Sequence, residues 1–341
     1  MNEVRKTVLI LFRGTVLAAL MTATPAISSA SDMMSRSSSP VCVGKVQLAL
    51  PNSGVASWSQ SFDYSHVERM RGAKTKEAFW DAVAAREAEL RAMPHDSEDG
   101  RLGRTERIGD TAAILLYREH EASTLTHNMQ RFLWLDGKGY MLQSTGAMRP
   151  QFTENLAPFI EVFSRIHSSA EAAEPAMSDF CIDGAVVRGD IGRISAGVSV
   201  GISGWNHVAL WAGATEGGAA SGRMVSPRDE LRERQRTIRQ VRRLEPDARS
   251  DPEYPRDFDV LRSAARKAGR LDGEEVAWRE RLNNGASIYV FLWRGQLPGT
   301  DHVVTVGMDV GDQYQPGEQP PAEDELIALW DETLGSLRSP N

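Results

Sequence analysis

The sequence predicts an α+β fold of two related units, each an antiparallel sheet packed with helices. Strand motifs recur: residues 290–293 repeat the pattern of residues 131–134, and the segment that begins at Phe180 echoes the segment around Cys42. The strongest evidence for the repeat comes from the helix expected at the end of each unit. Four apolar positions recur at a constant separation of 171, namely Leu156, Phe159, Phe163 and Ile166 against Ile327, Trp330, Leu334 and Leu337. Chance similarity between short apolar segments is the alternative.

The first unit is predicted over residues 41–167. Residues 41–51 have the composition of a strand that ends in a turn at Pro51. A helix is expected over 75–93, with Thr75 as its N-cap and apolar residues on one face. Strands are expected at 112–118 and 130–135, and a turn at 137–139 leads into a returning strand at 140–144. A helix that ends near Ile166 closes the unit.

A small, polar and unperiodic segment at residues 168–178 has the composition of a linker, and the second unit is predicted over 179–339. A helix is expected from Pro227 to Leu244, because Ser226 can cap it and proline suits its first turn. Strands are expected at 275–279 and 290–293. The two cysteines are 139 positions apart and the closing helices 171, so the second half contains about 32 extra residues. These are expected in the arginine-rich helix and in residues 251–269.

The first 30 residues have the features of a cleaved signal peptide. Arg5, Lys6 and Arg13 precede a short apolar core at 14–21, and Ser28-Ser29-Ala30 offers the small residues of a cleavage site after Ala30. A membrane-spanning helix needs about 20 apolar residues, and Arg13 leaves too few on either side of it. The sequence therefore predicts export to the periplasm, a flexible leader at 31–40, and no stable membrane insertion after cleavage.

Charge and cysteine content narrow the function classes. The formal charge is −7, and loss of the signal peptide would make it −9, so binding to nucleic acid is not expected. About 310 remaining residues exceed one typical core and favour two domains. Cys42 and Cys181 are the two cysteines of the sequence. They are candidates for a disulfide in an oxidising compartment, or for two separately buried thiols.

One motif invites an enzymatic interpretation. Residues 197–201 fit the G-x-S-x-G pattern of a nucleophile elbow around Ser199, and His302 could serve as a base. The residues that follow favour a strand over the helix that such an elbow requires, so a glycine-rich hairpin is the preferred interpretation. The seven histidines lack metal-ligand spacing, and Glu274-Glu275 is expected in a solvated turn. No catalytic residue, metal or cofactor is predicted.

The arginine-rich segment 228–236 could form a phosphate or lipid-headgroup site. Its interleaved acidic residues favour a solvated helix face, with Glu230 and Arg234 as a stabilising pair four residues apart, and a partner contact as the minority interpretation. Trp58, Trp80, Trp205, Trp211 and Tyr254 are mostly expected in the core, although aromatic and arginine side chains also anchor protein interfaces.

The strand Cys42-Val43-Gly44 that ends in Leu50-Pro51, and the second start Phe180-Cys181-Ile182-Asp183-Gly184, resemble the periplasmic immunity proteins of type VI secretion lipase effectors. The resemblance is to the two-domain Tle cognate immunity protein family, and it covers nearly the whole mature chain. It implies a non-enzymatic protein that clasps a cognate phospholipase toxin between two domains and holds the toxin's lid. No interface residue can be transferred from it. Two other functions stay open, a periplasmic serine hydrolase that uses Ser199 and an envelope protein that binds lipid or another ligand.

Overall fold

The computed structural model describes residues 38–51, 56–63, 65–96, 100–123, 126–144, 155–169, 179–189, 194–202, 205–216, 225–245, 247, 250–311 and 321–339. The predicted signal peptide, its cleavage site after Ala30, and most of the predicted leader and linker lie outside these residues. The last three leader residues already belong to a strand, because the first strand begins at Ser38.

The elements of the first half and those of the second half follow the same order along the chain. The first half contains β1 (Ser38–Val43), β2 (Val46–Pro51), β3 (Ser57–Phe62), β4 (Ser65–Arg69), α2 (Lys76–Ala92), β5 (Leu102–Ile108), β6 (Ala112–Arg118), β7 (His127–Leu135), β8 (Lys138–Ser144), α4 (Ala157–Arg165) and β9 (Ile166–Ser168). The second half contains β10 (Phe180–Ile182), β11 (Ala185–Val187), β12 (Ser195–Ile202), β13 (Trp205–Glu216), α5 (Pro227–Leu244), β14 (Pro255–Ala268), β15 (Leu271–Leu282), β16 (Ser287–Gln296), β17 (His302–Val310) and α6 (Glu323–Gly335).

The predicted α+β architecture of two related units is confirmed by the strand order of the main sheet. This 12-stranded sheet runs β14-β15-β16-β17-β13-β12-β3-β4-β8-β7-β6-β5, and every described pairing in it is antiparallel. From one edge to the middle the order is β14, β15, β16, β17, β13, β12, and from the other edge it is β5, β6, β7, β8, β4, β3. Strands at the same place in these two series are equivalent in the two halves of the chain. Each unit therefore contributes half of one continuous sheet, and the two halves meet where β3 pairs with β12.

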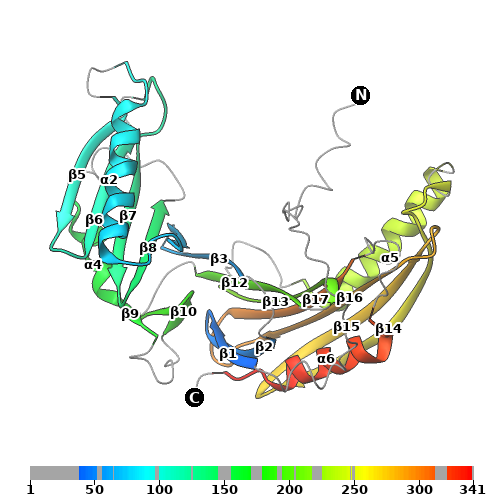
Figure 1. Cartoon of the computed structure of the whole chain (residues 1–341). Coiled ribbons are helices and arrows are strands. Elements are labelled where there is room, and N and C mark those ends of the chain that lie inside the picture. Colours follow the sequence, from blue (N-terminus) through cyan, green and yellow to red (C-terminus); the bar gives the residue numbers. More distant parts are fainter. Residues whose placement is uncertain are drawn as a thin grey trace, which may run out of the picture.

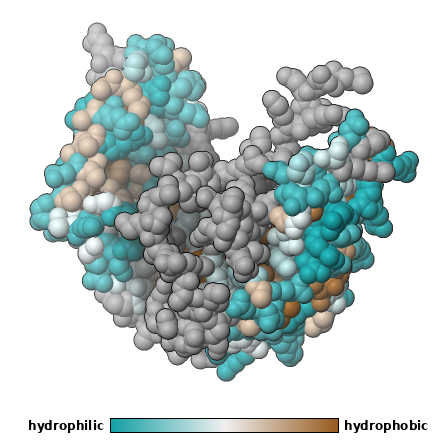
Figure 2. Space-filling view, turned by 45° about the vertical axis from the view of Figure 1, so that its right-hand side comes forward, coloured by the Kyte–Doolittle hydropathy of each residue, from teal (hydrophilic) through white to brown (hydrophobic). Residues whose placement is uncertain are grey.

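The sheet bends between the units, so the molecule has two lobes that stand at an angle (Figure 1). In the space-filling view the lobes are separate at the top, and the lobe that carries α5 has a mainly hydrophilic surface (Figure 2). The continuous sheet was not predicted, because the sequence indicates which segments are strands but not which edges of two sheets join.

The helices lie on both faces of the sheet, and equivalent helices share a face. The core beneath α2 contains Phe79, Val83 and Leu90 with residues of β5–β7, and the core beneath α5 contains Leu231 with Val276 and Leu292. The residues paired across the strands from β16 to β7 show that both cores lie on the same face of the sheet. The helices α4 and α6 cover the opposite face, and Figure 1 shows α6 beside the hairpin β1–β2 there.

Local sequence signals account for the helix boundaries. The Thr75 hydroxyl accepts a hydrogen bond from the Ala78 amide at 3.2 Å, and Ser226 accepts one from the Arg228 amide at 3.1 Å. Both are N-cap bonds that satisfy an amide left free by the first helical turn. The predicted helices at 75–93 and 227–244 are therefore confirmed nearly to the residue.

The predicted single strand at 41–51 is wrong, because Gly44 breaks it into the hairpin β1–β2. Gly44 has a φ of +60°, which favours glycine, and a side chain at this position would come within 2.5 Å of the Ala214 Cβ atom. The same change of direction occurs at Gly184 between β10 and β11, where φ is +74°. Both turns are flanked by apolar residues on each side, so the sequence pattern resembles one uninterrupted strand.

The two short hairpins are exchanged between the units. The hairpin β1–β2 belongs to the first half of the chain but contacts β12, β13 and α6 of the second. The Gln47 amide donates to the Arg338 carbonyl at 2.9 Å, and the Arg338 amide donates back at 2.7 Å. The hairpin β10–β11 belongs to the second half but pairs with β9 of the first, where Val186 lies opposite His167. Gln47 and Val186 are 139 positions apart, as are the two cysteines.

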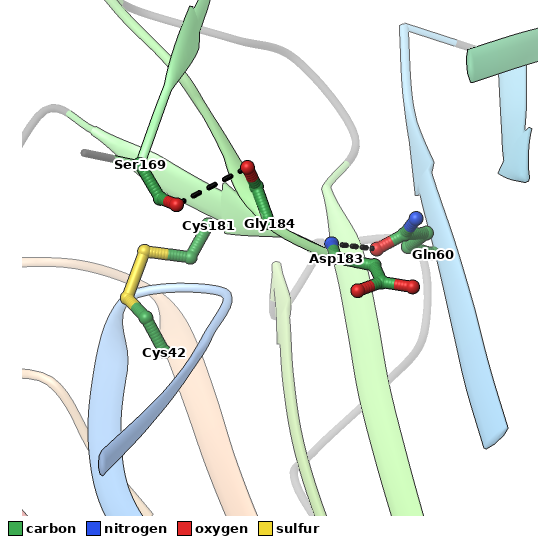
Figure 3. The surroundings of a disulfide bond; sticks show 6 residues. All are labelled: Cys42, Gln60, Ser169, Cys181, Asp183 and Gly184. Atoms are coloured by element: carbon green, nitrogen blue, oxygen red, sulfur yellow. Dashed lines mark hydrogen bonds between the residues drawn. A yellow bond between two sulfur atoms is a disulfide. The ribbon is translucent and has the colours of Figure 1, made fainter. Parts of the chain in front are cut away.

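A disulfide joins the two exchanged hairpins at equivalent positions (Figure 3). Cys42 on β1 is bonded to Cys181 on β10, with the Cα atoms 5.6 Å apart. Beside the bond, the Gly44 amide donates to the Cys181 carbonyl at 3.1 Å and the Cys181 amide donates to the Gly44 carbonyl at 2.6 Å. The bond thus fixes each hairpin to the hairpin that replaces it in the other unit.

Replacing both cysteines by serine is expected to reduce the free energy of unfolding by about 2–5 kcal/mol, because the bond closes a loop of 139 positions in the unfolded chain. Urea unfolding of the double variant Cys42→Ser/Cys181→Ser against the oxidised parent measures this difference. The reduced parent serves as the control and should unfold with the double variant. Equal midpoints for the oxidised and reduced parent would contradict the prediction.

Candidate functional site

The G-x-S-x-G motif forms the middle of a strand. Gly197, Ser199 and Gly201 alternate along β12 with two buried valines. Val198 is 2% exposed and Val200 is 6% exposed. This period of two places the small residues on the α2/α5 face and the valines in the core on the opposite face. The preferred interpretation as a glycine-rich hairpin is confirmed, because β12 returns as β13.

The structure places Ser199 apart from His302, the residue proposed as its base. It lies between Trp211 on β13 and Ser57 on β3, and the strand continues on both sides of it without the turn that exposes a nucleophile. His302 lies opposite Glu216, five positions along the strands from Trp211. At about 3.3 Å per residue, this is roughly 16 Å along the sheet. Ser199 and His302 therefore do not form the pair that the serine hydrolase alternative would require.

Small polar residues continue across the seam between the units. Ser57 and Ser59 on β3 are exposed, and they lie opposite Ser199 and Gly197. The helices on this face pack on β5–β7 at one end and on β14–β16 at the other. Among the described residues, the face around β3 and β12 thus lies between α2 and α5 without a helix packed on it. We name this stretch, defined by Ser57, Ser59, Gly197, Ser199 and Gly201, the sheet floor.

An aromatic side chain borders the sheet floor toward the second unit. Trp211 on β13 lies over Gly307 on β17, where an added Cβ atom would come within 2.2 Å of the indole. The indole nitrogen donates to the Asp309 carboxylate at 2.8 Å. Gly307 is therefore required for the ring to lie flat against the strand, and a polar bond fixes the ring in place.

The arginine-rich helix α5 rises beside the sheet floor with its charged face outward. Arg232, Arg236, Arg239 and Arg243 are exposed, which agrees with the predicted solvated face. The predicted pair of Glu230 with Arg234 is wrong. Arg234 instead donates two hydrogen bonds to the buried Glu280 on β15, at 2.7 and 2.6 Å, and this pairing raises the pKa of Arg234. Glu230 accepts from Arg294 on β16 at 2.7 Å, so both residues hold the helix to the sheet.

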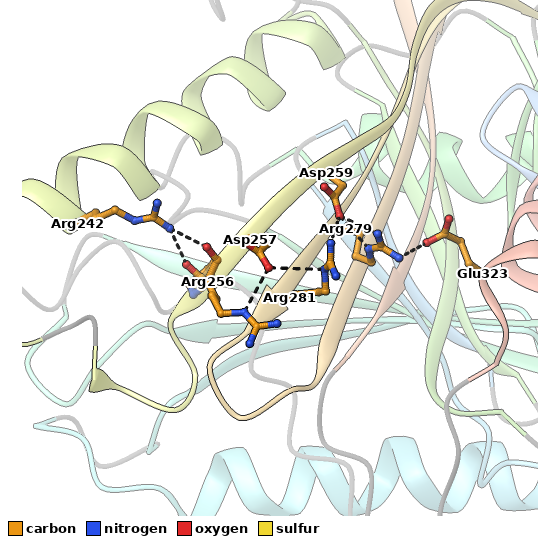
Figure 4. A network of polar contacts seen from close by, with 8 residues as sticks. Arg242, Arg256, Asp257, Asp259, Arg279, Arg281 and Glu323 are labelled. Atoms are coloured by element: carbon orange, nitrogen blue, oxygen red, sulfur yellow. Dashed lines mark hydrogen bonds and ion pairs between the residues drawn. The ribbon is translucent and has the colours of Figure 1, made fainter.

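Ion pairs also tie the edge strand β14 to its neighbours (Figure 4). The Asp259 carboxylate accepts from Arg279 at 2.7 Å and from Arg281 at 3.0 Å, and these bonds lower the pKa of Asp259. Arg279 also donates to Glu323 at the start of α6, at 2.8 Å. At the end of α5, Arg242 donates to the carbonyls of Pro255 and Arg256. Two helices on opposite faces are thereby connected through β14 and β15.

The predicted solvated turn at Glu274-Glu275 is wrong, because both residues belong to β15. The Glu275 side chain is buried and accepts hydrogen bonds from Arg262 at 3.2 Å and Arg266 at 2.7 Å. It also accepts one from the Trp330 indole at 2.5 Å. A buried carboxylate needs such partners, and this cluster joins β14, β15 and α6.

Asp183 holds the exchanged hairpin β10–β11 on the first unit. Its carboxylate accepts from Arg69 at 3.2 Å and from Arg71 at 2.9 Å, and its side chain is 9% exposed. Its backbone amide donates to the Gln60 side chain at 2.8 Å, as Figure 3 shows. The Tyr140 hydroxyl donates to the Asp183 carbonyl at 3.0 Å, and burial raises the pKa of Tyr140, so this group stays protonated. We name this group, Asp183 with Arg69, Arg71, Gln60 and Tyr140, the junction cluster.

The structure brings together the residues predicted as a disulfide and separates those of the hydrolase alternative. The described residues include no group of three or more histidine, cysteine or acidic side chains that could hold a metal ion. None of the described helices is long and apolar enough to cross a membrane. Sequence reasoning missed the sheet floor, although serines at alternate positions 57, 59 and 61 are a signal of period two.

Comparisons with known proteins agree with this architecture. Residues 174–340 match the family model described as the Tle cognate immunity protein 4 C-terminal domain. Three solved structures share the fold and cover 88% of this chain: the crystal structure of the Tle4-Tli4 complex, with 19% identity over 96% of that chain and a TM-score of 0.68; the apo immunity protein TplEi of the type VI secretion system of Pseudomonas aeruginosa, with 19% over 96% and 0.65; and TplEi complexed with "L" peptide, with 18% over 97% and 0.64. No curated protein sequence matches this chain.

Removing the negative charge of Asp183 is expected to loosen the exchanged hairpin. Asp183→Asn leaves two arginines without their shared carboxylate, and we expect a loss of about 1–3 kcal/mol in the free energy of unfolding. Amide hydrogen exchange in residues 180–187 should also become faster. The control Asp229→Asn removes a pair in which both side chains are more than half exposed, and it should change stability by less than about 0.5 kcal/mol. Similar losses in the two variants would argue against a junction role.

Proposed function

We propose that this chain, whose residues 174–340 match the Tle cognate immunity protein 4 C-terminal domain, binds and inhibits a cognate phospholipase effector of the type VI secretion system in the periplasm. The family match is the observation that carries the proposal. The shared fold of a solved relative that is in complex with Tle4 supports it across both units. The chain would thereby protect the cell that produces it.

The periplasmic location has two supports. Residues 1–30 have the composition of a cleavable signal peptide, with a basic start, a short apolar core and small residues before the expected cleavage site. The disulfide between Cys42 and Cys181 belongs to an oxidising compartment such as the periplasm. An effector that attacks phospholipids from the periplasmic side would meet the chain there.

Inhibition by this chain is binding without chemistry. Ser199, the one serine that matches a nucleophile motif, is a mid-strand residue with small neighbours, and His302 is distant from it. The free energy of the inhibited state must therefore come from contact with the effector. A protein ligand shifts its target between active and inactive conformations only by its difference in affinity for the two.

The sheet floor and the helices beside it are the surface that we propose for this contact. The floor lies between two lobes that are set at an angle, so a partner seated on it could contact both units at once (Figure 1). Its small side chains allow a close approach of the partner's backbone or aromatic groups. The exposed arginines of α5 add a cationic rim that would favour an acidic patch on the effector and speed encounter. A standard interface of about 1,600 Å² would reach both features.

A bulky charge on the sheet floor is expected to impair inhibition without unfolding the chain. Ser59→Arg places a long side chain at an exposed position of β3 that faces the proposed partner. We expect the Kd for the cognate lipase to rise about 10- to 100-fold, or roughly 1.4–2.8 kcal/mol. Titration of lipase activity with purified variant, together with co-purification, measures the effect.

The matched control is Ser164→Arg, an exposed serine on α4 on the opposite face of the sheet. It should inhibit the lipase as the parent does. If the parent leaves lipase activity unchanged at saturating concentration, the proposed function is wrong. If both serine variants inhibit as the parent does, the function stands and the sheet floor is not the contact.

A further inference from the structure

We propose that a basic pocket at the junction between the units binds a small phosphate-class anion, either inorganic phosphate or the phosphate of a glycerophosphate headgroup. The pocket has a volume of about 220 Å³ and lies where the chain leaves β4 and where β7 turns into β8. Four cationic side chains line it: Arg69, Arg71, Lys74 and Lys138. We name this the basic pocket. None of the residues that line it belongs to the sheet floor.

The cations of the basic pocket outnumber the carboxylates that face them. Arg69 and Arg71 share one carboxylate, that of Asp183. Lys138 donates to a neutral acceptor, the Gly184 carbonyl, at 3.1 Å. The nearby Asp136 accepts a hydrogen bond from Ser168 at 2.7 Å. Arg69, Arg71 and Lys138 therefore converge on the turn 183–184, and Lys74 adds a fourth, exposed ammonium group. The carboxylates of Asp183 and Asp136 are the two negative charges set against these four cations.

This local charge is opposite to that of the whole protein, whose formal charge is −7. Like charges held together by the fold repel one another, and a bound anion relieves that repulsion. Arginine and lysine are the side chains that bind phosphate most readily, since the guanidinium presents several donors in one plane and the ammonium acts as a point charge. Arg71 is half-exposed, and one of its terminal nitrogens donates to both Asp183 and the Ala56 carbonyl, so the other guanidinium donors remain for an anion.

The size of the basic pocket selects among anions. Its volume is below the roughly 300–1,000 Å³ of pockets that hold drug-sized ligands, so it suits a single phosphate group with a short substituent. Gly139 lines the pocket and packs closely on its neighbours, because an added Cβ atom would lie 3.0 Å from the Phe79 ring and 3.2 Å from the Met70 Cβ atom. The pocket therefore depends on tight packing between the β7–β8 turn and the start of α2.

Anion binding at this place would also act on the junction. Arg69 and Arg71 line the basic pocket and at the same time hold Asp183 of the exchanged hairpin. A phosphate that neutralises the excess charge would lower the repulsion within the junction cluster and so raise the melting temperature. A ligand that binds the folded state alone stabilises it in proportion to the logarithm of its concentration.

The test is isothermal titration calorimetry and thermal melting of the full chain with inorganic phosphate and with glycerol 3-phosphate, at constant ionic strength set with chloride. We expect saturable binding and a rise in melting temperature with both. Lys74→Glu reverses an exposed charge in the basic pocket and should weaken binding about tenfold. Lys267→Glu, an equal charge change at an exposed lysine of β14, should bind as the parent does.

The outcomes separate the alternatives. Melting of both variants without phosphate shows whether each is folded. No saturable binding of either probe to the parent, or equal weakening by Lys74→Glu and Lys267→Glu, would overturn the proposal. Flotation with phosphatidylglycerol vesicles then identifies the source of the anion: co-flotation that Lys74→Glu removes indicates a lipid headgroup, and no flotation indicates a soluble phosphate. Ser59→Arg should retain phosphate binding, so the fate of the basic pocket can be separated from that of effector inhibition.

Discussion

Backbone hydrogen bonds between β3 and β12 join the two halves of the chain into one sheet, and the other contacts between the halves are arranged around that seam. Because β3 and β12 are each preceded in the chain by a short hairpin, both hairpins leave the seam close to the opposite unit. A short connection is then sufficient for β1–β2 to reach α6 and for β10–β11 to reach β9. The exchange of hairpins follows from the position of the seam.

The seam also explains why the sheet floor has small residues. An antiparallel sheet commonly packs one face on the core and leaves the other to solvent, and near the seam the core lies on the side of α4 and α6. Side chains on the other face of β12 and β3 are glycine or serine, which leave a flat polar strip between two helices. The apolar side chains of these two strands are covered on one face, and the other face is small and polar, as is common in antiparallel sheets.

Much of this architecture could be predicted from the sequence, and the errors have physical causes. The repeat, the caps at Thr75 and Ser226 and the closing helices depend on local periodicity, which a sequence contains. The turn at Gly44 and the burial of Glu275 depend on partners distant in sequence, Ala214 for the first and Trp330 for the second. The junction cluster was missed for the same reason: Asp183 meets Arg69 and Arg71 across more than a hundred positions. The family resemblance implied only that a partner binds between the two units and gave no residue of the site, because the joining of two sheet edges leaves no local signal in the sequence.

The disulfide between equivalent positions of a repeat has a consequence for how such a chain could arise. A protein with only one copy of the repeat would have a single thiol, which could form this disulfide only with a second molecule. Its hairpin would likewise pack on that second molecule. Fusing two copies in one chain turns a bond that depends on protein concentration into one whose ends are always near each other. The joining of the two units is then independent of how much of the protein a cell has made.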